Sequence, residues 1–381
     1  MRRTILLCLL PVCLYAQSPK VETMVQFWGH QMQGKELRLN SPAWPHAPLP
    51  TGLNENGFVV RRAEVWLSGT VGERISYTFM NDFALAGNGL LVAQAVGQRG
   101  QWEVRAGAFR PLQTWEGMQR DYDLLLAERF QFARVFADKS DWGAVIGRGL
   151  GGQRWKAFAG VFNGGGRSAD RNGRKDLIAR LQFKAAAHAA GIYGLRGGTD
   201  LSDKGLQAAL LPGTGAPEAN AVLASEDRTV NLGVYYVFDR GAWFLHTEGV
   251  GGLWGRRYAS LVTTPGAAAR EHLDQRFLNT VVTLAHTRGK HSAILRWDRL
   301  DANWGDRWYG ADSPYVRGGR EIPPVYTETI LGYRFAWRPA ATREANLKIN
   351  WIHRTRFLAP RPRQDGAQGG DGLLFSVQVM Q

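Results

Sequence analysis

The chain has 381 residues, with 47 Lys and Arg against 33 Asp and Glu, and a formal net charge of +14. Its 44% hydrophobic residues exclude a largely disordered chain, and its two cysteines exclude a disulfide or zinc scaffold. A mean hydropathy of −0.27 argues against a bundle of membrane-spanning helices. The positive charge suits nucleic acid, an anionic lipid surface or small anions.

Residues 1–16 have the composition of a secretory signal peptide. A short basic start precedes an uncharged apolar run over 5–15, and Ala16 is a small residue at a plausible cleavage point. The run is too short to remain as a spanning anchor, so we expect 17–381 to form the exported domain. Cleavage would remove both cysteines and two arginines. Export also makes nucleic acid an unsuitable partner.

The rest of the chain alternates apolar and polar residues with a period of two. Val230, Leu232 and Val234, for example, alternate with Asn231 and Gly233. This period predicts strands with one apolar and one more polar face. Sixteen such segments are expected, at 21–31, 57–70, 73–83, 88–97, 101–109, 142–149, 153–163, 174–184, 187–198, 228–239, 242–253, 275–288, 290–300, 325–338, 344–356 and 371–381.

Short and long connections between these segments alternate along the chain. Every second connection is a short turn, at 71–72, 98–100, 150–152, 185–186, 240–241, 289 and 339–343. Most of the others are long, at 32–56, 110–141, 199–227, 254–274, 301–324 and 357–370. Soluble sandwiches and lectins also alternate but have no reason to sort their connections. The pattern predicts an all-β fold, a transmembrane antiparallel up-and-down barrel of about sixteen strands with short periplasmic turns and long extracellular loops.

The polar face of each strand should line the lumen, because a charge facing lipid near the midplane costs about 2–4 kcal/mol. The basic residues placed inside are Arg62, Arg74, Arg105, Arg154, Lys156, Arg180, Lys184, Arg296, Arg334, Lys348 and Arg354. The acidic ones are Glu64, Asp82, Glu103, Asp176, Glu248, Asp298 and Glu328. A barrel of this size holds water, and a basic lumen favours anions. Pairing of these charges, for example Arg62 with Glu64, would weaken that selectivity.

The longest connection, 110–141, is the candidate for a constriction. It is long enough to fold into the lumen, and 122–136 is rich in helix formers. The alternative is an external loop with solvated charges. With this loop included, the predicted pore-lining, anion-attracting residues are Arg62, Arg105, Arg110, Arg129, Arg134, Arg154, Lys156, Arg180, Arg296, Arg334 and Lys348.

Short motifs follow one another along the chain, namely Gly57–Glu64 (GFVVRRAE), Gly107–Pro111 (GAFRP), Glu128–Arg129 before Asp141–Gly143 (DWG), Val161–Gly166 (VFNGGG), Asp176–Leu181 (DLIARL) and Arg296–Asp301 (RWDRLD). Their order resembles the phosphate-selective porin O and P family of Gram-negative outer membranes. The resemblance implies a sixteen-stranded outer-membrane porin. It also implies a homotrimer that passes small anions, with phosphate or polyphosphate favoured, and no cofactor.

Three features depart from the family pattern. The chain has nine Lys against 38 Arg, and Arg110 stands where the family carries lysine. The chain ends on Val379-Met380-Gln381 instead of an aromatic residue. Because arginine binds phosphate bidentately and can hold it too long for fast release, we expect a general anion pore rather than a phosphate-specific one.

Other functions remain open on the sequence. The stretch 147–152 reads G-x-G-x-x-G, but a strand rather than a helix follows it, so we interpret it as a turn. The eight histidines lack the spacing of metal ligands. A barrel hydrolase built on His291, Asp298 and Asp301 is the weakest alternative. A non-conducting barrel that acts as an adhesin or anchor through its long loops is the stronger one.

Overall fold

The computed structural model describes residues 19–32, 56–85, 89–137, 140–152, 154–166, 173–200, 226–255, 275–301, 304, 316–317, 320–321, 325–340, 343–357 and 368–381. The expected signal peptide at 1–16 lies outside these residues, as do most of the long connections.

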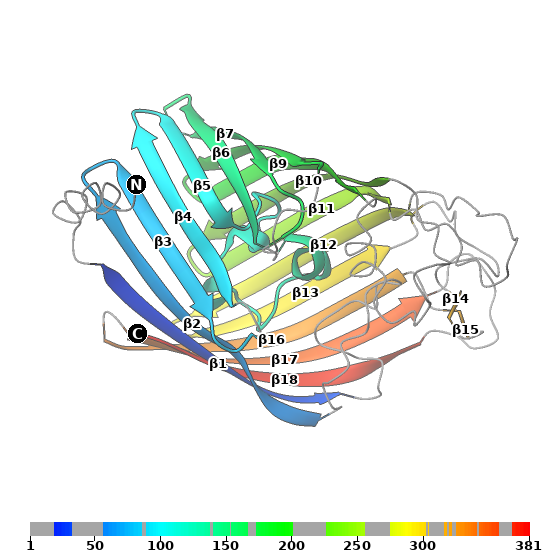
Figure 1. The fold of residues 1–381 in the computed structure, drawn as a ribbon. Helices are drawn as coiled ribbons and strands as arrows, with labels where there is room; N and C mark the ends of the chain where they lie inside the picture. Colours follow the sequence, from blue (N-terminus) through cyan, green and yellow to red (C-terminus); the bar gives the residue numbers. More distant parts are fainter. Residues whose placement is uncertain are drawn as a thin grey trace, which may run out of the picture.

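Sixteen antiparallel strands form a closed barrel, in which β1 pairs with both β2 and β18 (Figure 1). The strands are β1 (Lys20–Met32), β2 (Asn56–Val71), β3 (Ile75–Asp82), β4 (Leu90–Arg99), β5 (Trp102–Phe109), β6 (Asp141–Leu150), β7 (Trp155–Phe162), β8 (Asp176–Ala185), β9 (His188–Asp200), β10 (Glu226–Arg240), β11 (Trp243–Gly255), β12 (Gln275–Arg288), β13 (His291–Asp301), β16 (Val325–Ala340), β17 (Arg343–Phe357) and β18 (Gln368–Met380). A separate two-stranded ribbon joins β14 (Val316–Arg317) and β15 (Arg320–Glu321). The predicted barrel and its sixteen strands are confirmed.

The alternation in sequence becomes an outer apolar face and an inner, more polar face. On β10, Leu232 and Val234 are 58% and 53% exposed, whereas Asn231 and Tyr235 are 5% and 6% exposed. Such exposed rows of Val, Leu, Phe and Trp recur around the barrel and are suited to lipid. Within the described part of the chain, no helix is both long and apolar enough to cross a membrane.

Short turns close one end of the barrel. Between β6 and β7 the turn uses Gly151 and Gly152, at φ of 55° and 67°, where a side chain would be strained. The G-x-G-x-x-G stretch is therefore a strand end and a turn, as interpreted from the sequence. The carboxyl terminus lies at this same end (Figure 1).

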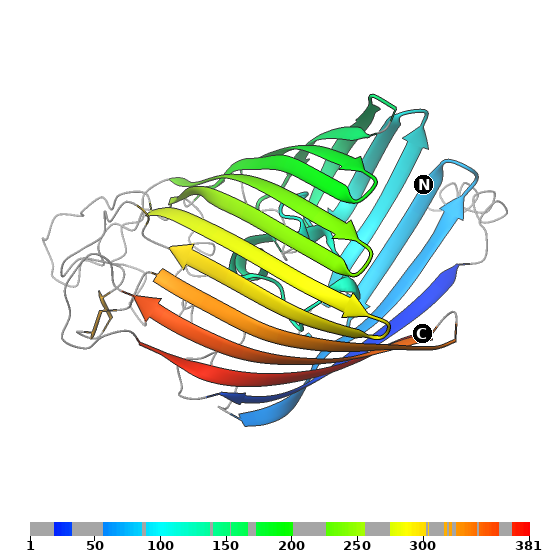
Figure 2. The ribbon, with the colours of Figure 1, turned by 180° about the vertical axis from the view of Figure 1, so that it is seen from behind.

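The wall of the barrel is uneven in height. Strands β3 to β8 have 8–10 residues each, and we call them the short wall. The remaining strands have 11–16 residues and form the long wall. Figure 2 shows the long wall from outside, with β10 to β13 and β16 to β18 running side by side.

Candidate functional site

The connection between β5 and β6 lies inside the barrel, as predicted (Figure 1). It contains two short 3-10 turns, η1 (Glu116–Met118) and η2 (Asp121–Asp123), and one π-helical turn, η3 (Ala133–Ala137). Only the last part of the predicted helical stretch is helical. A regular helix would put Leu126 and Phe130 on one face, whereas here they pack into two different apolar clusters. We call residues 110–140 the inner loop.

Apolar packing fixes the inner loop against the long wall. Phe130 and Phe132 join Tyr193, Phe277 and Tyr326 in a buried cluster inside the barrel. The inward faces of these strands are therefore dry where the loop covers them. The sequence interpretation assumed that water lines the whole inner surface. The buried cluster shows that water lines only a part of it.

Buried polar groups on the wall hold the backbone of the inner loop. Arg180 on β8 donates hydrogen bonds to the carbonyl oxygens of Gln113 at 3.0 Å and Thr114 at 3.3 Å. Arg296 on β13 donates to the carbonyl oxygen of Glu128 at 3.2 Å and pairs with the carboxylate of Glu116. These guanidinium groups replace the water that the loop carbonyls would otherwise bind.

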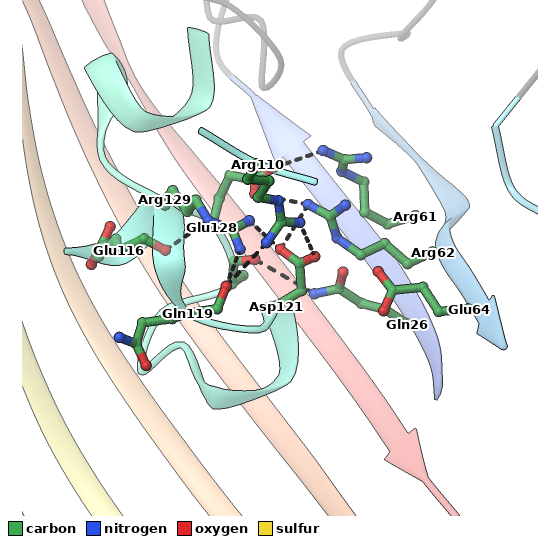
Figure 3. A network of polar contacts seen from close by, with 12 residues as sticks. Gln26, Arg61, Arg62, Glu64, Arg110, Glu116, Gln119, Asp121, Glu128 and Arg129 are labelled. Atoms are coloured by element: carbon green, nitrogen blue, oxygen red, sulfur yellow. Dashed lines mark hydrogen bonds and ion pairs between the residues drawn. The ribbon is translucent and has the colours of Figure 1, made fainter. Parts of the chain in front are cut away.

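A cluster of charges ties the inner loop to β2 (Figure 3). The Asp121 carboxylate pairs with Arg62 at 3.1 Å, with Arg110 at 3.1 Å and with Arg129. Glu128 pairs with Arg61 at 3.0 Å and with Arg62 at 3.5 Å. Four arginines thus meet two loop carboxylates, so about half of their positive charge is neutralised locally.

The same arginines control the ionisation of the loop carboxyls. Burial alone would raise the pKa of Asp121, but the guanidinium groups of Arg129, Arg62 and Arg110 outweigh it and hold that pKa well below its usual range. Burial likewise opposes ionisation of Glu128, and the charges of Arg61 and Arg62 lower its pKa. Both carboxyls are therefore ionised at neutral pH.

The depressed pKa of Asp121 predicts how the inner loop responds to acid. A carboxyl with a lowered folded pKa stabilises the fold above its unfolded pKa of about 4, and this stabilisation is lost as the pH falls through the folded value. We expect the loop cluster to persist from pH 7 to about 4 and to loosen only below it. Recordings of channel noise against pH check this, with Asp121→Asn as the variant that should loosen the loop at neutral pH. Equal noise in this variant and the wild type would contradict the expectation.

Half-buried charges remain on β5 and β7 of the short wall. The inner loop touches this wall too, because its Leu112 packs with Val145 and Phe162 in a buried cluster. Arg105 on β5 pairs with Glu103 at 3.0 Å and lies over the ring of Phe109 at 5.5 Å. Lys156 shares the inward face of β7 with Phe158, whose ring packs beside the buried cluster at Phe162. The space between this wall and the inner loop is the candidate path for solutes.

The profile of the phosphate-selective porin O and P family matches residues 50–259, which is more than half of the chain. The chain belongs to this family. The resemblance drawn from the motif order is thereby confirmed, and family and barrel together place this porin in the outer membrane as a channel.

Solved barrels share the fold of this porin. The outer membrane channel DcaP of Acinetobacter baumannii is 10% identical, with a TM-score of 0.62 over 97% of this chain and 98% of that one. An anion-selective porin from Comamonas acidovorans is 11% identical, with a TM-score of 0.57 over 96% and 99%. The trimer form of Vibrio cholerae OmpT is 7% identical, with a TM-score of 0.52 over 96% and 99%. A search of curated protein sequences finds no match.

The eleven basic residues predicted to line the pore fall into three groups in this porin. Five are buried against the inner loop or its ion pairs, namely Arg62, Arg129, Arg180, Arg296 and Lys348. Five are partly buried, namely Arg105, Arg110, Arg134, Lys156 and Arg334. The structure places Arg154 in the exposed turn between β6 and β7, one residue before the strand, whereas the sequence interpretation put it on the strand. That any of them attracts anions stays a prediction.

One contributor to the cluster is missed by simple alternation. The register of β1 and β2 shifts at Gln26 and Phe27, so that Gln26 pairs with Arg62 and Phe27 with Val60. This bulge leaves Arg61 without a strand partner and lets it reach Glu128 together with Arg62. The only signal in the sequence is two adjacent arginines on an otherwise alternating strand.

The hydrolase hypothesis finds no assembled site on β13. His291 lies on the outer face, where its Nδ1 is 2.6 Å from the hydroxyl of Tyr333. Asp298 lies on the inner face and accepts hydrogen bonds from Gln131 and Asn279. Six residues of β13 lie between these two residues, and their side chains point to opposite faces of the barrel wall. Among the described residues, no group of three or more His, Cys, Asp or Glu could hold a metal.

Proposed function

We propose that this porin is a passive diffusion pore for small anions, including phosphate. The supporting observation is a series of cations along the short wall. In the register of β6 and β7, Lys156 lies opposite Gly149, near the short turns. Arg105 on β5 lies farther from the turns, opposite Val145, and Arg110 follows the end of β5. At roughly 3.4 Å per residue, successive cations lie about 13–17 Å apart along the path.

The charged side chains that remain accessible to ions determine whether the pore selects anions or cations. Glu103 neutralises part of the charge of Arg105, and Asp121 part of that of Arg110, whereas Lys156 adds to the series. Rings or rows of positive side chains in a water-filled pore favour anions. The family description and the anion-selective neighbour from Comamonas acidovorans support the same sign.

A titration with phosphate tests the solute. In planar bilayers bathed in potassium chloride, added inorganic phosphate should lower the chloride current in proportion to its occupancy of the pore. Permeation of phosphate predicts a residual current carried by phosphate alone when chloride is withdrawn. An unchanged chloride current and no phosphate current would remove phosphate from the list of solutes.

A second candidate is a barrel that does not conduct. The dry packing of the inner loop on the long wall is the observation that favours it. Such a barrel would give no current steps in bilayers, although it would insert and remain folded. The short wall then has no reason to carry Arg105 and Lys156 on its inward face.

We also propose that the porin is a homotrimer joined through the short wall. Outward alanines form two sets of directly paired neighbours on the short wall, Ala95–Ala106–Ala144 and Ala159–Ala179, and Gly194 on the adjoining β9 continues the second set. Larger outward side chains such as Val104, Ile146 and Leu177 flank these small residues on the same wall. Small side chains let two membrane proteins approach closely, and the Vibrio cholerae neighbour is described in a trimer form.

Enlarging this patch should separate the subunits. Ala144→Phe with Ala159→Phe adds bulk to a face that lipid would tolerate, so each barrel should stay folded while the trimer is lost. Molecular mass in detergent, measured by light scattering, checks the assembly. Val234→Phe on β10 is the matched control and should leave the mass unchanged. Trimers that survive the double variant would place the interface elsewhere.

A further inference from the structure

A cavity of about 370 Å³ lies beneath the inner loop, at the end of the barrel with the short turns. Trp115 and Met118 of the loop form its roof, and Ala186 and Ala187 of the β8–β9 turn lie at its mouth. A solute on the candidate path would pass this cavity close to the short turns. Its size is within the range of sites that hold small organic ligands.

One side of the cavity is cationic. Arg180 is fixed there by its hydrogen bonds to the loop carbonyls and to the Tyr235 hydroxyl at 2.9 Å. Its guanidinium carbon lies 4.9 Å from the centre of the Tyr235 ring. Lys184 follows four residues later on the same face of β8 and is exposed. Asp239 and His188 complete the titratable groups of the lining, so positive charge exceeds negative.

The other side of the cavity is apolar. The Trp115 ring is held by Phe244, with ring centres 5.6 Å apart, and by His246 at 4.9 Å. Met118 and Val237 extend this surface. Because Trp115 is only partly buried, one part of its ring remains available to a ligand. A rigid aromatic surface beside two cations is suited to a ligand that has an apolar part and a negative charge.

We propose that this cavity is a binding site for a small organic anion with an apolar body. The anionic group would bind Lys184, beside the fixed charge of Arg180, and the apolar body would pack on Trp115 and Met118. The inference rests on the proposed function, since the lumen is the route by which the ligand arrives. An inorganic anion can use only the cationic half, so it binds more weakly.

The test is block of the chloride current in bilayers by three probes added to one compartment. Benzenesulfonate has the charge and the ring, inorganic sulfate has only the charge, and benzyltrimethylammonium has the ring with the opposite charge. At equal concentration we expect strong block by benzenesulfonate, weak block by sulfate and no block by benzyltrimethylammonium. Block by sulfate with the same affinity would overturn the proposal.

Two exposed lysines at the end of the barrel with the short turns provide a matched pair of variants. Lys184→Gln should weaken the benzenesulfonate block about fivefold, because one charged contact is lost. Lys290→Gln lies in the exposed turn between β12 and β13, outside the cavity, and should leave the affinity unchanged, whereas Lys184→Arg should preserve the block. Equal block in wild type and Lys184→Gln would refute the site.

The two proposals fail in different ways. A normal anion current without selective block would reject the cavity and leave the pore intact. If no current is seen, calorimetric titration of the detergent-purified porin with benzenesulfonate still tests the cavity. Lack of binding in that titration would reject it as well.

Discussion

Replacing Arg296 by methionine should release the inner loop and raise the single-channel conductance roughly twofold or more. Arg296 is 1% exposed and joins Thr283 on β12, the Glu128 carbonyl oxygen and the Glu116 carboxylate. Without it, Glu116 stays in the barrel interior as a charge that has lost its main partner. Breaking a buried ion pair on one side costs about 3–5 kcal/mol, which is enough to detach this segment of the loop.

A second substitution separates release of the loop from general damage. Glu116→Gln combined with Arg296→Met removes both charges, so most of the stability and the low conductance should return. Resistance of the folded barrel to detergent without heating shows that each variant inserts correctly. If Arg296→Met conducts like the wild type with the same current noise, the inner loop does not limit the pore.

Reversing two charges on the short wall should reverse the ion selectivity. Arg105→Glu with Lys156→Glu changes the wall by four charge units at positions where ions pass within a screening length of about 10 Å. The wild type should favour chloride, and the double variant should favour potassium. The sign of the reversal potential in a potassium chloride gradient measures the change directly.

Controls come from residues that the structure places away from the path. Arg154→Glu lies in the exposed turn between β6 and β7 and should leave the sign of the reversal potential unchanged. Lys348→Met removes a cation that is 0% exposed and donates to the Leu126 carbonyl oxygen at 3.3 Å. That variant should disturb the loop without changing the sign. A change of sign in Lys348→Met, or its absence in the short-wall variant, would contradict the assignment.

The barrel could be predicted because its physics is local. Because the outer face of a closed sheet contacts lipid, apolar residues must recur with a period of two along every strand. The short turns lie at one end of the barrel and the long loops at the other. The strands therefore begin and end within three residues of the predicted bounds. The inward position of residues 110–140 was also predictable from its length after β5.

The roles of the arginines could not be predicted in the same way. Alternation places Arg105 and Arg296 on the same inward face, but the Arg105 side chain is 22% exposed and Arg296 is buried by the loop. The difference depends on how the inner loop packs on the long wall, a contact between segments far apart in sequence. Arg61 joins the cluster only through a bulge that alternation does not indicate.

The basic residues of the barrel interior thus have two different roles. Buried arginines such as Arg180 and Arg296 hold the carbonyls and carboxylates of the inner loop. Partly exposed cations on the short wall remain for solutes. The formal net charge of +14 therefore overstates the charge that a permeating ion meets.

The reversal potential of single wild-type channels in a potassium chloride gradient tests the central claim most directly. The purified porin should give stepwise currents whose reversal potential has the sign of chloride permeation. Its magnitude should be moderate, because ion pairs neutralise part of the cationic series. A reversal potential of the opposite sign, or a folded and inserted barrel without current, would contradict an anion pore.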